Sequence, residues 1–307
     1  MQIWYISDGK AGHRAQALGL IAALERQLIQ VQWLELAAQQ LSVSALLLHW
    51  LSAGSFGHLP ELIKNTSSPD LIIGVGHQTH WKVLLLKRNF PAAKTLVLMQ
   101  PSLPLSWFDY LIIPEHDSPV TQPNVFISRG VLNPVINEQR HQPGRGLILI
   151  GGPSKRHGWS DPDILFQLQQ IFAQYQGDEL IVTTSRRTPE HFLQQEFFQY
   201  LPEYARLCPV EHTPVGWLFE QLQLSAMVWV TEDSISMLYE ALTAGCQVQL
   251  IAMPRLKRDR ITYSIDQLLE QHIVGRSGQP AIDQIVPAPL NEADRAANWL
   301  IQQIQGE

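Results

Sequence analysis

The sequence contains little cysteine, little charge and no long apolar segment. Its 307 residues include two cysteines, Cys208 and Cys246, which are too few for a disulfide framework and favour a reducing compartment. No stretch reaches the roughly 18 apolar residues of a membrane-spanning helix, and we expect no signal peptide. We therefore expect a cytoplasmic protein that is either free or peripheral to the inner membrane.

Charged residues make up only 16% of the chain, and the net charge is −6. An acidic balance argues against a general nucleic-acid binder, which would usually be basic. Hydrophobic residues make up 45%, enough for a sizeable core. A low charge fraction with many apolar residues is typical of parallel sheets whose strands are buried on both faces. The length suits two domains of about 150 residues each.

Short apolar runs alternate with helical patterns along the whole chain, which indicates βαβ units and parallel sheets. In the first half we expect strands at 2–6, 31–36, 71–75, 95–99, 110–113 and 125–127, with helices at 14–29 and 78–89. In the second half we expect strands at 147–150, 180–182, 227–230 and 248–251, with helices at 162–175 and 292–304. The polar stretch 137–146 is interpreted as a linker. The prediction is an α/β protein with two Rossmann-like domains, 1–135 and 146–307, that face a cleft.

Ligands of open parallel sheets bind beyond the carboxyl ends of the strands, so the loops there are the places to search. The first strand is followed by a glycine-containing loop with Asp8, Lys10 and His13. Its glycines do not form the dinucleotide fingerprint, and a plain solvent-exposed turn is the alternative. His77 and His80 have metal-ligand spacing but no evident third ligand, so we expect no metal. The segment Glu115-His116-Asp117 either touches an acceptor or is a solvated loop.

The second half carries an unusual concentration of cations after its strands. Eight of the chain's 22 basic residues lie in three such loops: Lys155, Arg156, Arg186, Arg187, Arg255, Lys257, Arg258 and Arg260. Arginine and lysine beside glycine-rich backbone are how proteins hold phosphate. Solvated loop charges are the alternative interpretation, but three such loops favour a phosphorylated ligand.

The strand at 227–230 leads into a helix with an acidic residue inside it. Asp233 or Ser234 is expected to cap this helix at its N-terminus, and Gly245 is expected to end it. Capping does not explain Glu240, which lies among apolar and small residues. An ordinary solvated glutamate is the alternative to a ligand-binding one.

This last segment resembles the donor-side helix of two-domain GT-B glycosyltransferases. The whole chain resembles the mitochondrial fission Elm family, and we expect it to be a bacterial member of that family. The matching segments include 7–10, 114–117, Gly151-Gly152, 184–189 and 231–237. The resemblance implies that Glu240 holds the ribose hydroxyls of a nucleotide sugar. It also implies that the loop residues hold the diphosphate. The expected ligand-binding residues are Gly151, Gly152, Ser154, Lys155, Ser185, Arg186, Arg187, Glu232, Asp233, Ser234, Ser236, Met237 and Glu240. One departure is that no proline follows Gly245.

Three functions are compatible with these patterns. The first is a metal-independent glycosyltransferase that uses a nucleoside diphosphate sugar, no other cofactor, and a cell-envelope, lipid-linked or other acceptor. Its general base would be His13 or Asp8. The second is a nucleotide-sugar epimerase or hydrolase on the same fold, in which His77, Glu115 and His116 would matter more. The third is a non-catalytic protein that acts through partners or a membrane. It would use the apolar segment 46–56 with Trp50, although such a segment is more often part of a core.

Overall fold

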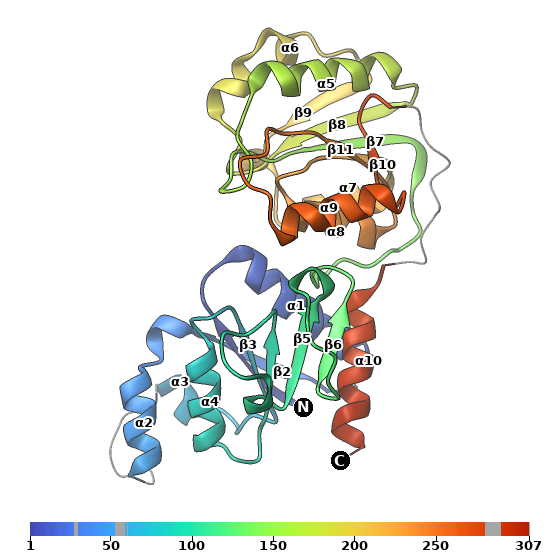
Figure 1. Ribbon diagram of the computed structural model, residues 1–307. Helices are drawn as coiled ribbons and strands as arrows, with labels where there is room; N and C mark the ends of the chain where they lie inside the picture. Colours follow the sequence, from blue (N-terminus) through green and yellow to red (C-terminus); the bar gives the residue numbers. More distant parts are fainter. Residues whose placement is uncertain (28–29, 53–58, 60, 280–289, 307) are drawn as a thin grey trace. The chain divides into compact units, whose positions relative to one another are not determined.

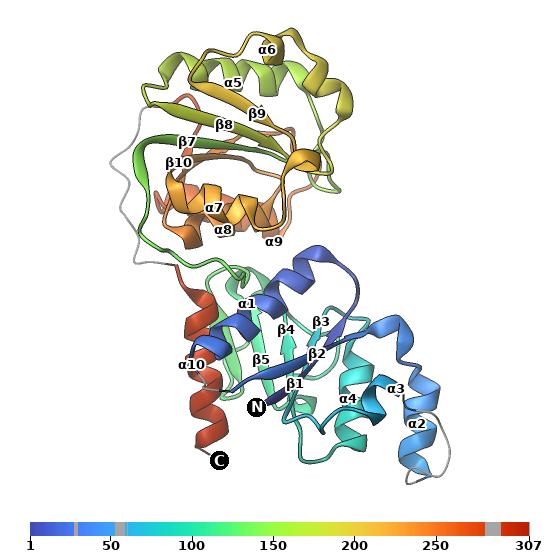
Figure 2. The ribbon, with the colours of Figure 1, turned by 180° about the vertical axis from the view of Figure 1, so that it is seen from behind.

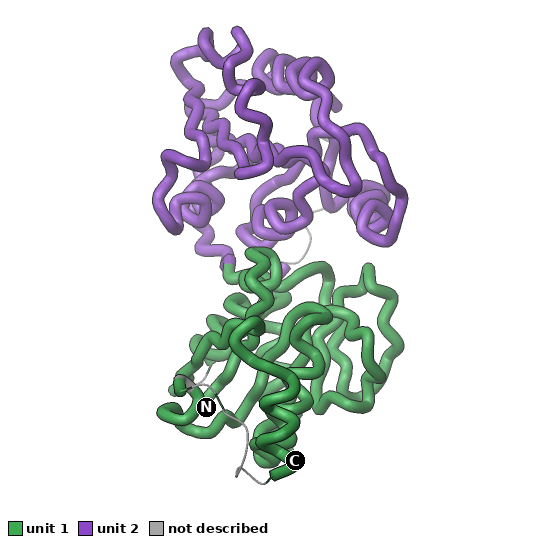
Figure 3. Tube along the Cα trace, turned by 90° about the vertical axis from the view of Figure 1, so that its left-hand side faces the viewer, with its two compact units in different colours: residues 1–134, 291–307 green, residues 135–290 purple. Residues whose placement is uncertain are grey.

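The computed structural model describes residues 1–27, 30–52, 59, 61–279 and 290–306. The chain forms two compact units (Figure 3), and unit 1 consists of Met1–Pro134 with Asn291–Glu307. Unit 2 consists of Val135–Leu290. Each unit contains a six-stranded sheet in which all neighbouring strands are parallel. The prediction of two Rossmann-like α/β domains is therefore confirmed.

The sheet of unit 1 has the strand order β2-β1-β3-β4-β5-β6. Its strands are β1 (Gln2–Ser7), β2 (Gln32–Ala37), β3 (Leu71–Val75), β4 (Lys94–Leu98), β5 (Tyr110–Pro114) and β6 (Val125–Ser128). All six lie within two residues of the predicted ranges. The order reverses between β1 and β3, so the carboxyl ends of these two strands form the crevice where such sheets bind ligands.

Helices cover both faces of this sheet (Figures 1 and 2). They are α1 (Ala11–Gln27), α2 (Val43–Leu51), α3 (Glu61–Lys64), α4 (His80–Asn89) and α10 (Glu292–Gln305). Ile3 and Tyr5 pack with α1 and α10, whereas Trp4 and Ile6 pack with α2, α3 and α4. Because successive side chains of a strand point to opposite faces, both faces of β1 are buried, and its sequence is a continuous apolar run.

The closing helix α10 belongs to unit 1, so the predicted domain 146–307 is wrong at its C-terminal end. Ala296, Ala297 and Leu300 are fully buried in the core beside α1. Trp299 contacts the ring of Phe126 on β6, and the Glu292 carboxylate accepts a 2.8 Å hydrogen bond from the Arg129 N–H. The apolar stripe of this helix is visible in the sequence, but the surface that it covers is not.

The sheet of unit 2 has the order β12-β11-β10-β7-β8-β9. Its strands are β7 (Gln142–Ile150), β8 (Glu179–Thr184), β9 (Ala205–Cys208), β10 (Ser225–Thr231), β11 (Gln247–Ile251) and β12 (Gly275–Arg276). Its helices are α5 (Asp161–Gln174), α6 (Glu196–Gln199), α7 (Trp217–Leu224), α8 (Ile235–Ala244) and α9 (Arg260–Glu270). The strand order reverses between β7 and β10, which places a second ligand crevice at their carboxyl ends.

Two local predictions need correction. Residues 142–146, interpreted as part of a linker, form the first half of β7. Polar side chains do not prevent strand pairing there, because the backbone bonds to both neighbours and Arg145 forms an ion pair with Glu179. In addition, α1 begins at Ala11, three residues before the predicted start. His13 therefore lies in the first turn of a helix.

Candidate functional site

In unit 1, the segment after β1 places His13 against Asp8. The Nδ1 atom of His13 lies 2.9 Å from Oδ2 of Asp8. The Asp8 side chain is fully buried, while His13 remains partly accessible. The backbone N–H of Lys10 donates to the other carboxylate oxygen of Asp8 at 3.2 Å. A carboxylate on Nδ1 fixes the orientation of the imidazole and leaves Nε2 to accept a proton from a ligand.

Gly76, directly after β3, completes this arrangement at the reversal point of the sheet. Its φ angle of +83° is one that residues with a side chain rarely adopt. A Cβ atom at Gly76 would lie 2.7 Å from Nδ1 of His13 and 3.0 Å from Oδ2 of Asp8. Glycine is thus required for both the backbone conformation and the close approach of the imidazole. Sequence reasoning missed this role, although the Gly-Val-Gly run at the strand end was visible.

The electrostatics of the pair favour an ionised aspartate. Burial acts to raise the pKa of Asp8, but the Lys10 N–H and the charge of His13 outweigh it and lower the pKa below its ordinary value. The ammonium group of Lys10 lies 3.3 Å from the same carboxylate. Asp8 therefore carries a negative charge at neutral pH and can stabilise the imidazolium that forms when His13 accepts a proton.

The two histidines after β3 lie in different environments. His77 is exposed, whereas His80 is buried at the start of α4. The His80 Nδ1 atom lies 3.4 Å from the Ser102 hydroxyl. Burial, and secondly the charge of His77, lower the pKa of His80, which favours its neutral form. Among the residues that the structure describes, no group of three or more His, Cys, Asp or Glu side chains is placed to hold a metal ion.

The loop after β5 differs from a plain solvated loop. Glu115 is exposed, but His116 and Asp117 are buried. The Gln100 N–H, in the loop after β4, donates to Oδ2 of Asp117 at 3.3 Å. The Nε2 atom of His116 lies 3.5 Å from Oδ1 of Asp117. Asp117 therefore ties together the loops after two neighbouring strands, and only Glu115 is freely accessible.

In unit 2, Gly151 and Gly152 after β7 contact the loop after β10. The Gly151 N–H donates to the Thr231 hydroxyl at 2.7 Å, and the Gly152 N–H donates to Asp233 at 3.2 Å. A side chain on Gly152 would collide with the backbone of Arg187. These glycines thus allow three loops to approach one another at the carboxyl edge of the sheet. Their N–H groups are already engaged within the protein.

Asp233 connects these loops through an ion pair in which the carboxylate is buried and the arginine is exposed. Its side chain is fully buried, and Oδ2 lies 2.7 Å from the Arg187 guanidinium. Arg187 also donates to the carbonyl oxygen of Gly152 at 3.0 Å. The other oxygen, Oδ1, has no hydrogen-bond partner within the described chain. Two of the predicted ligand-binding residues, Arg187 and Asp233, therefore form an ion pair with each other and neutralise each other's charge.

Other predicted cations are also paired with carboxylates. Arg156 donates to Asp259 at 2.8 Å, and the Lys257 ammonium lies 3.6 Å from the same carboxylate. Asp259 in turn caps α9 by accepting a hydrogen bond from the Ile261 N–H at 3.1 Å. The hydrogen bond with Arg156 and that cap outweigh desolvation and lower the pKa of Asp259. Both cations thus stabilise the start of α9.

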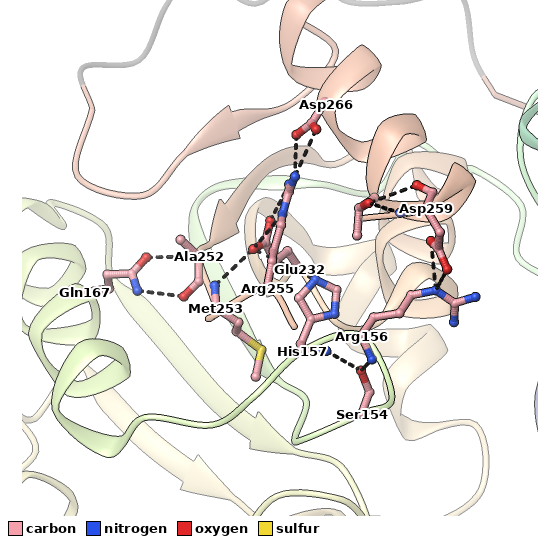
Figure 4. A network of polar contacts seen from close by, with 11 residues as sticks. Ser154, Arg156, His157, Gln167, Glu232, Ala252, Met253, Arg255, Asp259 and Asp266 are labelled. Carbon is pink, nitrogen blue, oxygen red and sulfur yellow. Dashed lines mark hydrogen bonds and ion pairs between the residues drawn. The ribbon is translucent and has the colours of Figure 1, made fainter. Parts of the chain in front are cut away.

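Glu232 is the centre of a buried network, shown in Figure 4. It accepts hydrogen bonds from the Arg255 guanidinium at 2.9 Å and from the Met253 N–H at 3.2 Å. Arg255 also bonds to Asp266 on α9 at 2.9 Å. His157 lies against Glu232, with Nε2 3.9 Å from Oε1, and burial lowers the pKa of His157. Glu232 and Arg255 therefore hold loops together and are occupied by each other.

Three of the eight predicted cations have no partner of opposite charge in the described parts of the chain. Lys155, Arg186 and Arg258 are exposed, and no described residue forms an ion pair or a hydrogen bond with their side chains. Arg260, the eighth, is the first residue of α9. Lys155 and Arg186 follow β7 and β8, which are adjacent strands. Lys155 and Arg186 are therefore available to an anionic ligand at the carboxyl ends of these two strands.

Two of the predicted serines, Ser154 and Ser185, contribute to turns. Ser154 Oγ accepts the N–H groups of Arg156 and His157 at 3.1 and 3.0 Å, which leaves its hydroxyl proton for a ligand. Ser185 Oγ accepts the Arg187 N–H at 3.2 Å and also lies 3.4 Å from the Thr188 hydroxyl oxygen. Both hydroxyls therefore lie in defined turns directly after β7 and β8.

The helix after β10 begins and ends where predicted. Ser234 occupies the N-cap position of α8, although its side chain makes no capping hydrogen bond. Ser236 is exposed and Met237 is half-buried in the first turn. Gly245 ends the helix with a φ angle of +89°, a backbone conformation that glycine adopts readily.

Glu240 on α8 is a carboxylate without a partner among the described residues. It is partly exposed, and no hydrogen bond or ion pair reaches it from any described residue. Desolvation raises its pKa to about 7. The Glu240 carboxylate is desolvated, and no hydrogen bond within the described chain compensates for the lost water. Such a group is a candidate for contact with a ligand.

Comparison with known proteins identifies the family. The sequence pattern of the family described as mitochondrial fission ELM1 matches residues 11–304. The chain belongs to the mitochondrial fission ELM1 family. A relative of this ELM1-family protein is the uncharacterized protein RP120 of Rickettsia prowazekii, which is 26% identical over 349 residues and covers 97% of each chain.

Solved structures similar to this ELM1-family protein have the GT-B fold. MnaA of S. aureus in complex with UDP has a TM-score of 0.56 at 11% identity, covering 99% of this chain and 96% of the other. The glycosyltransferase SnogD of Streptomyces nogalater has a TM-score of 0.51 at 12% identity, covering 100% and 95%. UDP-GlcNAc 2-epimerase of Neisseria meningitidis, bound to UDP-GlcNAc, has a TM-score of 0.50 at 10% identity, covering 100% of each chain. At these identities the likeness establishes the fold alone.

Proposed function

We propose that this ELM1-family protein is a glycosyltransferase that moves a sugar from a nucleoside diphosphate sugar to the hydroxyl of an acceptor. The observation that carries the proposal is the 2.9 Å contact between His13 and the buried Asp8. This pair has the geometry of a general base, and it lies at the reversal point of the sheet in unit 1. General-base catalysis by a positioned histidine contributes roughly 10²–10⁴-fold to a rate.

The donor is assigned to the loops at the reversal point of unit 2. Lys155 and Arg186 are exposed cations there without partners in the described chain, and Ser154 retains a hydroxyl donor. Together these groups can neutralise a diphosphate leaving group without a metal ion. Glu240, unpaired and desolvated, is assigned to the ribose hydroxyls, which would supply the hydrogen bonds that it lacks. The acceptor in this proposal is a hydroxyl compound of the cell envelope, such as a lipid-linked molecule, or another acceptor.

A second candidate function is a nucleotide-sugar epimerase or hydrolase. It is favoured by the buried pair of His116 and Asp117 at the carboxyl edge of unit 1, close in sequence to the exposed Glu115. Such an enzyme would use the same donor site and would need no acceptor. The GT-B fold serves both kinds of chemistry among the similar structures, so the fold does not choose between them.

Release of nucleoside diphosphate from a panel of nucleotide sugars tests the proposal. The protein is incubated with each sugar alone and with an extract of cell-envelope lipids and glycans, in the presence of a chelator. A glycosyltransferase releases the diphosphate rapidly only when the extract is present, and chelation does not inhibit it. Rapid conversion of the donor without the extract supports the second candidate instead. A lack of any conversion contradicts both.

A further inference from the structure

Helix α2 exposes almost all of its apolar side chains. Within Val43–Leu51, Leu46 is the one residue counted as buried. The exposed fraction is 50% for Leu48 and 67% for Leu51. Val43, Leu47 and Trp50 are exposed as well. The interpretation of the segment 46–56 as core holds for Leu46 and is wrong for Leu47, Leu48, Trp50 and Leu51. Residues 53–56 of the predicted segment lie outside the described chain.

The exposed surface continues from α2 onto α4 and the loop before β5. The Arg88 guanidinium lies over the Trp50 ring, 5.5 Å from its centroid, and α2 packs along α4 (Figures 1 and 2). Trp81 lies two turns before Arg88 on α4, which places it on the same side of the helix. The Trp81 ring contacts Trp107 edge to face, with centroids 5.9 Å apart. Both rings are about half exposed.

We define the apolar surface of unit 1 as the exposed large apolar side chains of α2, α4 and the loop before β5. They are Val43, Leu47, Leu48, Trp50, Leu51, Trp81 and Trp107. Exposed apolar side chains gathered on neighbouring elements mark an interaction site, unlike apolar side chains exposed singly. Leucine and tryptophan side chains are also the pair that interfacial helices insert between lipid headgroups.

The segments that carry this surface have charged side chains of one sign only. The segments 43–51, 80–89 and 105–107 contain no aspartate or glutamate, whereas 80–89 contains Lys82, Lys87 and Arg88. Lys87 lies 3.4 Å from Asp109. Lys82 and Arg88 have no carboxylate partner within the described residues. A local charge of this sign in a chain with a net charge of −6 attracts an anionic surface selectively.

We propose that this apolar surface docks unit 1 on an anionic phospholipid bilayer. Leu48, Leu51 and the two tryptophans would enter the headgroup region, and Lys82 and Arg88 would contact lipid phosphates. The inference concerns binding to lipid and holds whether or not the protein is a glycosyltransferase. No helix of the described chain is long and apolar enough to cross a membrane, so the proposed contact is peripheral.

Co-sedimentation with vesicles tests the proposal. The full chain is mixed with vesicles of phosphatidylcholine alone or of phosphatidylcholine with an equal amount of phosphatidylglycerol. We expect binding to the anionic vesicles, and a fall of roughly tenfold or more for the double variant Leu48→Gln, Leu51→Gln, which removes two inserted side chains. Phe166→Gln, at an exposed phenylalanine on α5 of unit 2, is the matched control and should bind as the wild type does.

A second double variant, Lys82→Gln with Arg88→Gln, tests the charge separately and guards against misfolding of the first. It should weaken binding to anionic vesicles, and added salt should weaken wild-type binding in the same direction. Equal binding of the wild type and the leucine variant would overturn the proposal, as would equal binding to both kinds of vesicle. A wild-type dimer that the leucine substitutions dissociate, without vesicle binding, would instead assign the surface to a second copy of the chain.

Discussion

The imidazole of His13 contacts the carboxylate of Asp8 directly above a glycine that has no room for a side chain. The Nδ1 atom of His13 lies 2.9 Å from Oδ2 of Asp8, and a Cβ atom at Gly76, whose φ angle is +83°, would lie 2.7 Å from that nitrogen and 3.0 Å from that oxygen. Asp8 and Gly76 directly follow β1 and β3, between which the strand order of unit 1 reverses, and His13 lies in the first turn of α1. Such points are where open parallel sheets place ligands, so the fold positions a candidate base where a substrate is expected.

Replacing His13 by Asn should reduce turnover while leaving donor affinity nearly unchanged. The expected loss is roughly a hundredfold to ten-thousandfold, because a general base acts in the transition state. Steady-state kinetics combined with donor titration measures the two quantities separately. Equal losses in turnover and in donor affinity would indicate that His13 binds the donor instead.

Substituting Gly76 by Ala should damage both stability and activity. The left-handed backbone alone costs about 1 kcal/mol or more, and the added Cβ would displace the His13 ring. Gly216→Ala is the matched control, since Gly216 has a φ angle of +85° but open space around its Cα atom. The strain of alanine at a positive φ angle should lower the free energy of unfolding in urea by a similar amount in both variants. Turnover should fall in Gly76→Ala only.

The Glu232–Arg255 pair should matter for stability more than for ligand binding. Arg255→Ala leaves a buried carboxylate without its cation, which costs about 3–5 kcal/mol of unfolding free energy. Arg258→Ala, in the same loop but without a partner in the described chain, should change it by no more than about 0.5 kcal/mol. Denaturant unfolding compares the two variants. A small loss for Arg255→Ala would mean that the network of Figure 4 contributes little to folding.

Glu240 should destabilise the ligand-free protein above neutral pH. Its pKa is about 7 in the folded protein against an ordinary value of 4.5. The unfolded chain therefore releases this proton more readily, and folding loses stability as the pH rises from about 4.5 through 7. Glu240→Gln, which stays neutral, should be more stable than the wild type at pH 8 by at most about 3 kcal/mol. That gain should vanish near pH 4, and a gain independent of pH would exclude titration of Glu240 as its cause.

The sequence reveals the strands and the loops that follow them. It does not reveal which charged side chains of those loops form ion pairs with one another. Apolar runs such as Leu71–Val75 are legible because both faces of the strand are buried. The pairing of Arg156 with Asp259 joins residues 103 positions apart, and no local pattern indicates it. For the same reason the sequence did not show that four of the eight cations expected to bind phosphate are engaged by carboxylates. Lys155 and Arg186 remain beside the reversal point of unit 2.

The placement of α10 illustrates the same limit. Its apolar stripe predicts a buried face, and the helix lies where expected in the sequence. Burial beside α1 and β6 depends on contacts such as that between Glu292 and Arg129, which are 163 positions apart. Proximity in the chain favoured the second domain, and tertiary packing assigns the helix to the first.

Thermal unfolding with nucleotides tests the central claim most directly, which is that unit 2 binds a nucleoside diphosphate through Glu240. The wild type, Glu240→Ala and the control Glu270→Ala, at an exposed glutamate on α9, are heated with each nucleoside diphosphate and nucleotide sugar. A ligand at 100 times its Kd stabilises the folded state by about 2.7 kcal/mol. The account predicts a raised Tm with one nucleotide family in the wild type and in the control, and none in Glu240→Ala. An unchanged Tm of the wild type with every nucleotide, or an equal rise in Glu240→Ala, would contradict it.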